Sequence, residues 1–234
     1  MKVKKLSIII PSYNEEDTIL KVIKKVKSVN LGKIKKEIIV VNDGSTDKTT
    51  KVLSKLKTQN LKLKILTHKV NLGKGAAIRS ALKKVTGDVV VIQDADLEYD
   101  PNEYQQLLKP ILDGKADVVY GSRFMGNAPH RVLYFWHMLG NKILNLLSNS
   151  LTNLNLTDME TCYKMFTKEI ANKLNVQENR FGFEPEFTVK ISKMNARVYE
   201  VGISYSGRSY EEGKKINWKD GVWALWCLIK YRFS

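Results

Sequence analysis

The sequence predicts an α/β fold in which one mostly parallel sheet is flanked by helices within a single compact domain. Through the first 120 residues, short β-branched runs alternate with segments whose apolar residues recur at helical spacing. Strand–helix–strand alternation of this kind is typical of parallel sheets. The chain of 234 residues can form one substantial core, and no repeat or flexible linker divides it.

The first half is predicted to contain five buried strands, at 6–10, 37–41, 63–66, 88–92 and 117–120. Helices are expected between them, with apolar positions at 19–26, 52–56 and 77–82. The second half has a different character. It is expected to hold an apolar and aromatic segment over 131–154, a helix opening at 181–186, a strand over 200–205 and an aromatic, basic helix over 220–233.

Polar clusters follow four of the predicted strands, at 11–16, 42–47, 71–75 and 93–98. Right-handed crossovers place the loops that follow parallel strands at the same edge of a sheet, where such sheets bind ligands. We therefore expect the four loops to converge on one crevice.

The fourth cluster carries Asp94, Asp96 and Glu98 at alternating positions. Neighbouring carboxylates raise one another's pKa unless a cation offsets their charge. Hard oxygen ligands of this kind suit Mg²⁺ or Mn²⁺, so the cluster predicts a site for one of these ions. The alternative is a helix cap at Asp100 preceded by exposed carboxylates, an interpretation that suits Asp100 itself.

Two other loops carry candidate ligand-binding residues. Asp43 follows a strand directly and can accept hydrogen bonds from a base or a ribose. The alternative is a helix cap, for which Ser45 or Asp47 is better placed. Lys74 stands at a predicted helix start and can contact a phosphate, although its loop departs from the usual phosphate-loop pattern.

The charge balance points to an anionic partner, since 39 Lys and Arg residues face 24 acidic residues, for a net charge of +15. A basic nucleic-acid-binding module is one alternative, but it gives the acidic loops no purpose. A nucleotidyltransferase is another, but the loop after the first strand lacks the glycine-rich signature expected there. No signal peptide is expected, and the two cysteines, Cys162 and Cys227, favour a reducing compartment.

The aromatic segments suggest contact with a membrane surface. Trp218, Trp223 and Trp226 are interleaved with Lys219 and Lys230, as in a helix that lies in a membrane interface. The segment 131–151 could lie there too, or guide a lipid tail. The alternative for both segments is core packing of amphipathic helices. The apolar run 222–229 is too short to span a bilayer.

Several motifs occur together in an order that resembles the inverting family 2 glycosyltransferases of the GT-A fold, which is Rossmann-like. They are PSYNE at 11–15, NDGSTD at 42–47, NLGKG at 71–75, DAD at 94–96 and GSR at 121–123. Later motifs at 130–131, 157–164, 181–186 and 204–216 resemble more closely the polyprenyl- (dolichyl-) phosphate mannosyl- and glucosyltransferases. The resemblance covers nearly the whole chain.

The resemblance implies a role for each half of the chain. Residues 1–120 would bind the nucleotide sugar, 121–216 the acceptor, and 217–234 would form an amphipathic segment at the membrane. The nucleoside would be held by Pro11, Tyr13, Glu15 and Asp43. The diphosphate would be held by Asp94 and Asp96 through the metal, with Glu98 where many relatives have glutamine, and by Arg208. The acceptor phosphate would be held by Arg123 and Arg131.

The resemblance also implies a reaction. A hexose would pass from a nucleotide sugar to a polyprenyl or dolichyl phosphate with inversion, at the cytoplasmic face of the membrane. Arginines would position the lipid phosphate, and Mg²⁺ or Mn²⁺ would stabilise the leaving diphosphate. GDP-mannose is the first expectation for the donor and UDP-glucose the second. Asp158 is expected to orient the acceptor or the sugar; the alternative is a cap or turn residue.

Overall fold

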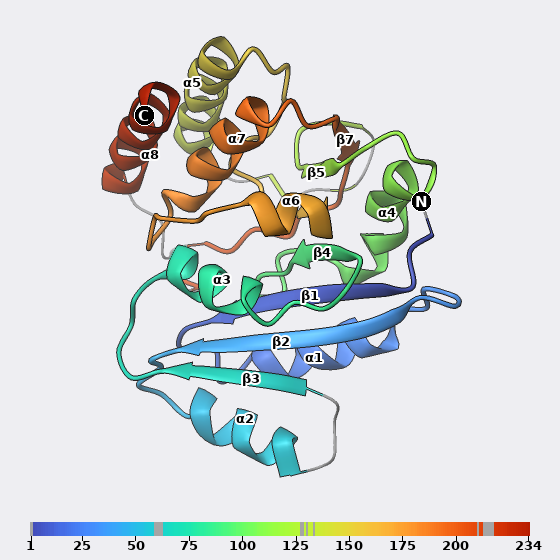
Figure 1. The fold of residues 1–234 in the computed structure, drawn as a ribbon. Coiled ribbons are helices and arrows are strands. Elements are labelled where there is room, and N and C mark those ends of the chain that lie inside the picture. The colour runs from blue at the N-terminus through green and yellow to red at the C-terminus, as the bar shows by residue number, and fades with distance from the viewer. Residues whose placement is uncertain are drawn as a thin grey trace.

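The structure, a computed structural model, describes residues 2–58, 63–126, 129, 131–132, 134–209, 211–212 and 218–234. A seven-stranded sheet with the order β3-β2-β1-β4-β6-β5-β7 runs through these residues, and helices flank it (Figure 1). The predicted α/β fold with one mostly parallel sheet is confirmed. In this part of the chain, no helix is long and apolar enough to cross a membrane.

The strands agree closely with the predicted apolar runs. They are β1 (Lys5–Ser12), β2 (Lys35–Asp43), β3 (Leu63–His68), β4 (Val89–Ile92), β5 (Val118–Ser122), β6 (Lys164–Thr167) and β7 (Val198–Gly202). Strands β1 to β4 pair in parallel, β6 runs antiparallel between β4 and β5, and β7 is parallel to β5.

Two details of the sheet differ from the prediction. Strand β6 was not predicted. The last strand lies over Val198–Gly202 rather than 200–205. At Gly202 the backbone packs so closely on Met125 that a Cβ atom would come 2.1 Å from the Met125 carbonyl oxygen. The chain leaves the sheet after this contact, and the residues that follow reach the ligand-binding edge.

The helices that the sequence predicts are present, together with two that it does not predict, over Tyr104–Leu112 and Lys168–Lys173. They are α1 (Ile19–Ser28), α2 (Thr49–Thr58), α3 (Lys74–Leu82), the 3₁₀ turn η1 (Pro101–Glu103), α4 (Tyr104–Leu112), α5 (Phe135–Thr152), α6 (Lys168–Lys173), α7 (Phe183–Lys193) and α8 (Trp218–Phe233). Asp47 accepts a hydrogen bond from the Thr49 amide at the start of α2, and Asp100 caps η1. Both predicted caps are therefore confirmed.

The core lies around the central strands, and the register of these strands fixes the ligand-binding edge of the sheet. The strand residues Ile8, Ile9, Val90 and Val91 are fully buried, as parallel strands covered on both faces must be. Ile9 pairs with Ile92 and Ser12 with Asn42, so β1, β2 and β4 end close together. This alignment brings their polar loops to one side of the sheet.

Candidate active site

One cavity of about 320 Å³ lies at this edge, and residues from all four predicted loops line it. The sequence-predicted site residues that line it are Pro11, Tyr13, Glu15, Asp43, Lys74, Asp94, Asp96, Glu98, Arg123 and Arg208. The expected convergence of the loops is therefore confirmed. Two predicted site residues, Asp158 and Arg131, do not line the cavity.

Asp43 organises the third loop. Its buried carboxylate accepts hydrogen bonds from the Leu72 amide at 3.0 Å, the Gly73 amide at 2.6 Å and the Asn71 side chain at 3.0 Å. His68, which the sequence did not suggest, places Nδ1 2.6 Å from the same carboxylate. Asp43 thus fixes the turn that precedes Lys74, and its contact with a nucleoside stays a prediction.

Lys74 is paired with two carboxylates. Its Nζ lies 3.0 Å from Asp94 Oδ1 and 3.0 Å from Glu184 Oε1. Burial alone would lower the pKa of Lys74, but the charges of Asp94 and Glu184 outweigh burial and raise that pKa well above its usual value. Burial would likewise raise the pKa of Asp94, and Lys74 lowers it instead. Lys74 therefore links Asp94 and Glu184 through two salt bridges in the wall of the cavity.

Arg208 faces the other carboxylates. Its Nη2 lies 2.8 Å from Asp96 Oδ2, its Nε 3.4 Å from Glu98 Oε1 and its Nη1 3.6 Å from Glu15 Oε1. Even so, burial together with the charges of Asp94 and Glu98 raises the pKa of Asp96 to about 8. The carboxylates at this edge therefore carry more negative charge than the guanidinium balances.

The carboxylates fit a divalent cation by their chemistry. Asp94 and Asp96 offer hard oxygen ligands at a place where positive charge is in deficit, as the raised pKa of Asp96 shows. Among the described residues, however, no group of three His, Cys, Asp or Glu side chains is arranged to hold a metal ion. Glu98 accepts hydrogen bonds from Tyr205 on one oxygen and from Arg208 on the other, so its ligation stays a prediction.

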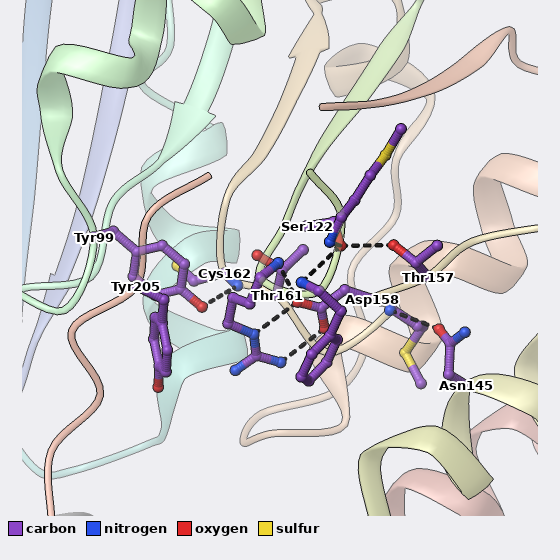
Figure 2. Close-up of polar contacts among 12 residues, drawn as sticks. Tyr99, Ser122, Asn145, Thr157, Asp158, Thr161, Cys162 and Tyr205 are labelled. Atoms are coloured by element: carbon purple, nitrogen blue, oxygen red, sulfur yellow. Dashed lines mark hydrogen bonds and ion pairs between the residues drawn. The ribbon is translucent and has the colours of Figure 1, made fainter. Parts of the chain in front are cut away.

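Arg123 and Asp158 form a bidentate ion pair. Nε and Nη2 of Arg123 lie 2.7 Å and 2.8 Å from the two oxygens of Asp158, which is 1% exposed. Glu200 accepts a hydrogen bond from the Asp158 amide. The neighbouring Thr157 hydroxyl is hydrogen-bonded to the Ser122 hydroxyl (Figure 2). Asp158 holds the guanidinium at the cavity wall, so any effect of Asp158 on an acceptor passes through Arg123.

Arg131 lies outside the cavity. It is exposed, and its Nη1 donates to the Gly207 carbonyl at 3.1 Å and lies 2.6 Å from Glu212. The described residues therefore give no support for direct contact between Arg131 and the cavity contents. Its neighbour His130, part of a quoted motif, lies outside the described residues.

Two glutamates to which the sequence assigned no role also line the cavity. Glu160 and Glu184 each have one buried carboxylate oxygen for which the described residues provide no hydrogen-bond partner. Burial, with the charge of Glu184, raises the pKa of Glu160 to about 8. Glu160 lies within the motif at 157–164 and Glu184 within the motif at 181–186. Their place in these motifs is the feature of the sequence that could have identified them as site residues.

Comparison with known proteins identifies the family. Residues 7–174 match glycosyl transferase family 2. The chain belongs to this family. It is a glycosyltransferase, and the acidic cluster after β4 lies within the matched region.

Two relatives of this glycosyltransferase have names that include dolichyl or dolichol phosphate. A dolichyl-phosphate beta-glucosyltransferase of Trichomonas vaginalis is 28% identical over 214 residues, covering 86% of this chain and 65% of the relative. A dolichol-phosphate mannosyltransferase of Pyrococcus furiosus is 28% identical over 218 residues, covering 91% and 60%. The chain therefore spans less than two thirds of the length of these two proteins.

A solved structure shows the same fold. The glucosyl-3-phosphoglycerate synthase of Mycobacterium tuberculosis, in complex with Mn²⁺, UDP and glucosyl-3-phosphoglycerate, matches with a TM-score of 0.74 and 19% identity. The match covers 98% of this chain and 80% of that chain. The glycosyltransferase therefore has the GT-A fold. Another crystal of the mycobacterial enzyme holds Mg²⁺ and UDP.

Proposed function

We propose that this glycosyltransferase transfers a hexose from a nucleotide sugar to a polyprenyl or dolichyl phosphate, with inversion and with Mg²⁺ or Mn²⁺ as cofactor. GDP-mannose is the favoured donor and UDP-glucose the alternative. The names of the relatives from Pyrococcus furiosus and Trichomonas vaginalis support mannose and glucose, respectively, as the transferred sugar. The metal complexes of the mycobacterial enzyme support the choice of cofactor.

The observation that carries the proposal is the charge balance of the cavity. Glu15, Asp94, Asp96 and Glu98 line one region, and within it they face the cations Lys74 and Arg208. A nucleoside diphosphate adds further negative charge to that region. A cation that accompanies it would offset this charge, which is the behaviour expected of a donor that arrives with a divalent ion.

The two unsatisfied glutamates suit the hexose end of the donor. A carboxyl group accepts hydrogen bonds when it is ionised and both accepts and donates when it is protonated, and sugar hydroxyls can take either part. Glu160 Oε1 and Glu184 Oε2 are both buried without a partner among the described residues, a state that costs roughly 1–3 kcal/mol for each group. A hexose that hydrogen-bonds to them would remove this cost, so we assign the part of the cavity that these two glutamates line to the sugar.

The remaining residues account for the chemistry of transfer. Asp94 and Asp96 would hold a bound Mg²⁺ or Mn²⁺, with Glu98 as a further candidate ligand, and the ion would neutralise charge on the leaving diphosphate. Arg208 lies beside these carboxylates and can pair with the diphosphate oxygens. Arg123 would bind the acceptor phosphate, which is already largely ionised near neutral pH. The acceptor then needs positioning for in-line attack rather than a strong base.

The proposed acceptor is a lipid, and α5 and α8 present the surface that suits a membrane at its cytoplasmic face. The two helices lie side by side (Figure 1). Their exposed apolar side chains are Phe135, Trp136, Ile143 and Leu146 on α5, and Trp218, Val222, Trp223, Trp226, Ile229 and Phe233 on α8. On α8, Ala224, Cys227, Leu228 and Tyr231 face the core instead. Core packing thus explains one face of α8, and the opposite face remains for a membrane interface.

One experiment tests the reaction. The protein is incubated with labelled GDP-mannose or UDP-glucose, Mg²⁺ or Mn²⁺ and a short polyprenyl phosphate, and the labelled lipid and its anomeric configuration are determined. We expect metal-dependent transfer to the lipid with inversion, most rapidly from GDP-mannose. The absence of labelled lipid with every donor would contradict the proposal. Tight RNA binding by an Asp94/Asp96 double variant would instead support the nucleic-acid-binding alternative.

A further inference from the structure

Tyr205 contacts both sides of the cavity. Its hydroxyl donates to Glu98 Oε2 at 2.8 Å, on the side that we assign to the donor diphosphate. Its ring centroid lies 5.1 Å from the guanidinium carbon of Arg123, on the side that we assign to the acceptor. The ring also lies 5.3 Å from that of Tyr99, and the two are drawn together in Figure 2. The side chain therefore joins a carboxylate to a guanidinium.

The backbone of Tyr205 extends this connection. Its amide donates to the Pro129 carbonyl at 3.1 Å, and its carbonyl accepts from the Arg131 amide at 2.8 Å. Tyr205 is therefore held by its backbone as well as by its side chain.

Three side chains support the guanidinium of Arg123. Asp158 holds the Nε and Nη2 edge in the plane of the group. The ring centroids of Tyr205 and Phe124 lie 5.1 Å and 5.6 Å from the guanidinium carbon, and such cation–π contacts orient the plane without using an N–H donor. Asp158 and the two rings together therefore determine where the guanidinium points, while donors remain for a phosphate.

We propose that Tyr205 is a positioning residue that holds Arg123 in the orientation that binds the acceptor phosphate. The inference rests on the proposed function, because it assumes that Arg123 binds that phosphate. The ring acts directly on Arg123. The hydroxyl acts indirectly, because its hydrogen bond to Glu98 holds the ring in place.

Two substitutions separate the ring from the hydroxyl. Tyr205→Phe removes the hydrogen bond to Glu98 and keeps the aromatic face, whereas Tyr205→Leu removes both. The difference between the two variants therefore isolates the ring. Tyr199→Phe is the matched control, since Tyr199 is an exposed tyrosine of β7 that does not line this cavity.

The test measures the affinity for geranyl phosphate, a water-soluble prenyl phosphate, by calorimetry. We expect the leucine variant to bind it roughly tenfold more weakly than the phenylalanine variant, a loss within the range of a cation–π contact. The affinities of the two variants for GDP and for UDP with Mg²⁺ should differ less than twofold. In an Arg123→Ala background the difference in geranyl phosphate affinity should disappear, because the ring acts through Arg123.

Equal affinities of the two variants for geranyl phosphate would overturn the inference, and so would a difference that persists without Arg123. If the leucine variant does not fold, Tyr205→Met takes its place. Failure of the wild-type protein to bind geranyl phosphate or to glycosylate a polyprenyl phosphate would instead reject the proposed function, and the role of Tyr205 with it.

Discussion

Replacing Glu160 by glutamine should stabilise the protein at alkaline pH and impair its reaction. The pKa of Glu160 is raised from 4.5 to about 8 by burial and by the charge of Glu184. Between these values the folded protein keeps a proton that the unfolded chain has lost. The free energy of unfolding therefore falls as the pH rises from about 4.5 to about 8. Glutamine is neutral and similar in shape, so it removes this dependence.

The structure sets the size of the effect. At about 1.4 kcal/mol per pKa unit, a shift from 4.5 to about 8 corresponds to about 5 kcal/mol. Glu160 is only half-buried and lines a cavity that admits water, so screening reduces this figure. We expect Glu160→Gln to exceed the wild type by about 2 kcal/mol at pH 8, and to match it below pH 4.5.

Urea denaturation between pH 4 and pH 9 measures this difference. Glu169→Gln is the control, because Glu169 is an exposed glutamate on α6 whose pairing with Lys173 is a surface contact. The control should follow the wild-type curve. A Glu160→Gln curve that runs parallel to that of the wild type across this range would refute the reasoning, as would lower stability at pH 8. At pH 8 and above, where Glu160 ionises, the same variant should raise the KM for the nucleotide sugar, since an amide oxygen accepts hydrogen bonds from sugar hydroxyls less strongly than a carboxylate does.

Three further substitutions test other parts of the site. Asp96→Ala should abolish transfer and leave the far-ultraviolet circular dichroism unchanged; near-normal turnover would contradict its assignment to the metal. Arg123→Ala should weaken use of the polyprenyl phosphate more than hydrolysis of the donor, and equal losses would argue against its acceptor role. Glu178 accepts hydrogen bonds from Trp223, Lys230 and Tyr231 of α8. Glu178→Ala should therefore lower the free energy of unfolding by about 2–4 kcal/mol in urea denaturation, and an unchanged value would show that these bonds do not anchor α8.

The sequence predicted the first half of the sheet because those strands are buried on both faces. Runs such as Ile8–Ile10 and Val89–Ile92 are continuously apolar, and periodicity alone identifies them. Strand β6 escaped notice because it is short and begins with Lys164. That lysine is fully buried, and its ammonium group donates to the carbonyls of Met159 and Thr161. A buried charge satisfied by backbone groups has no signature in a single sequence.

The site likewise has features that the sequence reveals and features that depend on tertiary contacts. The loops that follow the strands could be predicted to meet, since parallel topology alone brings them together. The partners of each charge could not. Arg123 pairs with Asp158, Lys74 with Glu184, and each pair is distant in the chain. Burial and pairing of these groups depend on the tertiary structure. From the sequence, Asp158 was therefore expected to contact the acceptor or the sugar, or to cap a turn, whereas in the structure it pairs with the Arg123 guanidinium.

Arg208 offsets part of the negative charge of the cavity. Its guanidinium faces Asp96, Glu98 and Glu15, and so supplies the positive charge that burial makes necessary. A donor and its cation would take over that balance, which would free the guanidinium to pair with the diphosphate. Tyr205 stands three positions earlier on the same segment and contacts Arg123. One short stretch of backbone therefore carries a residue on the side that we assign to the donor and a residue on the side that we assign to the acceptor.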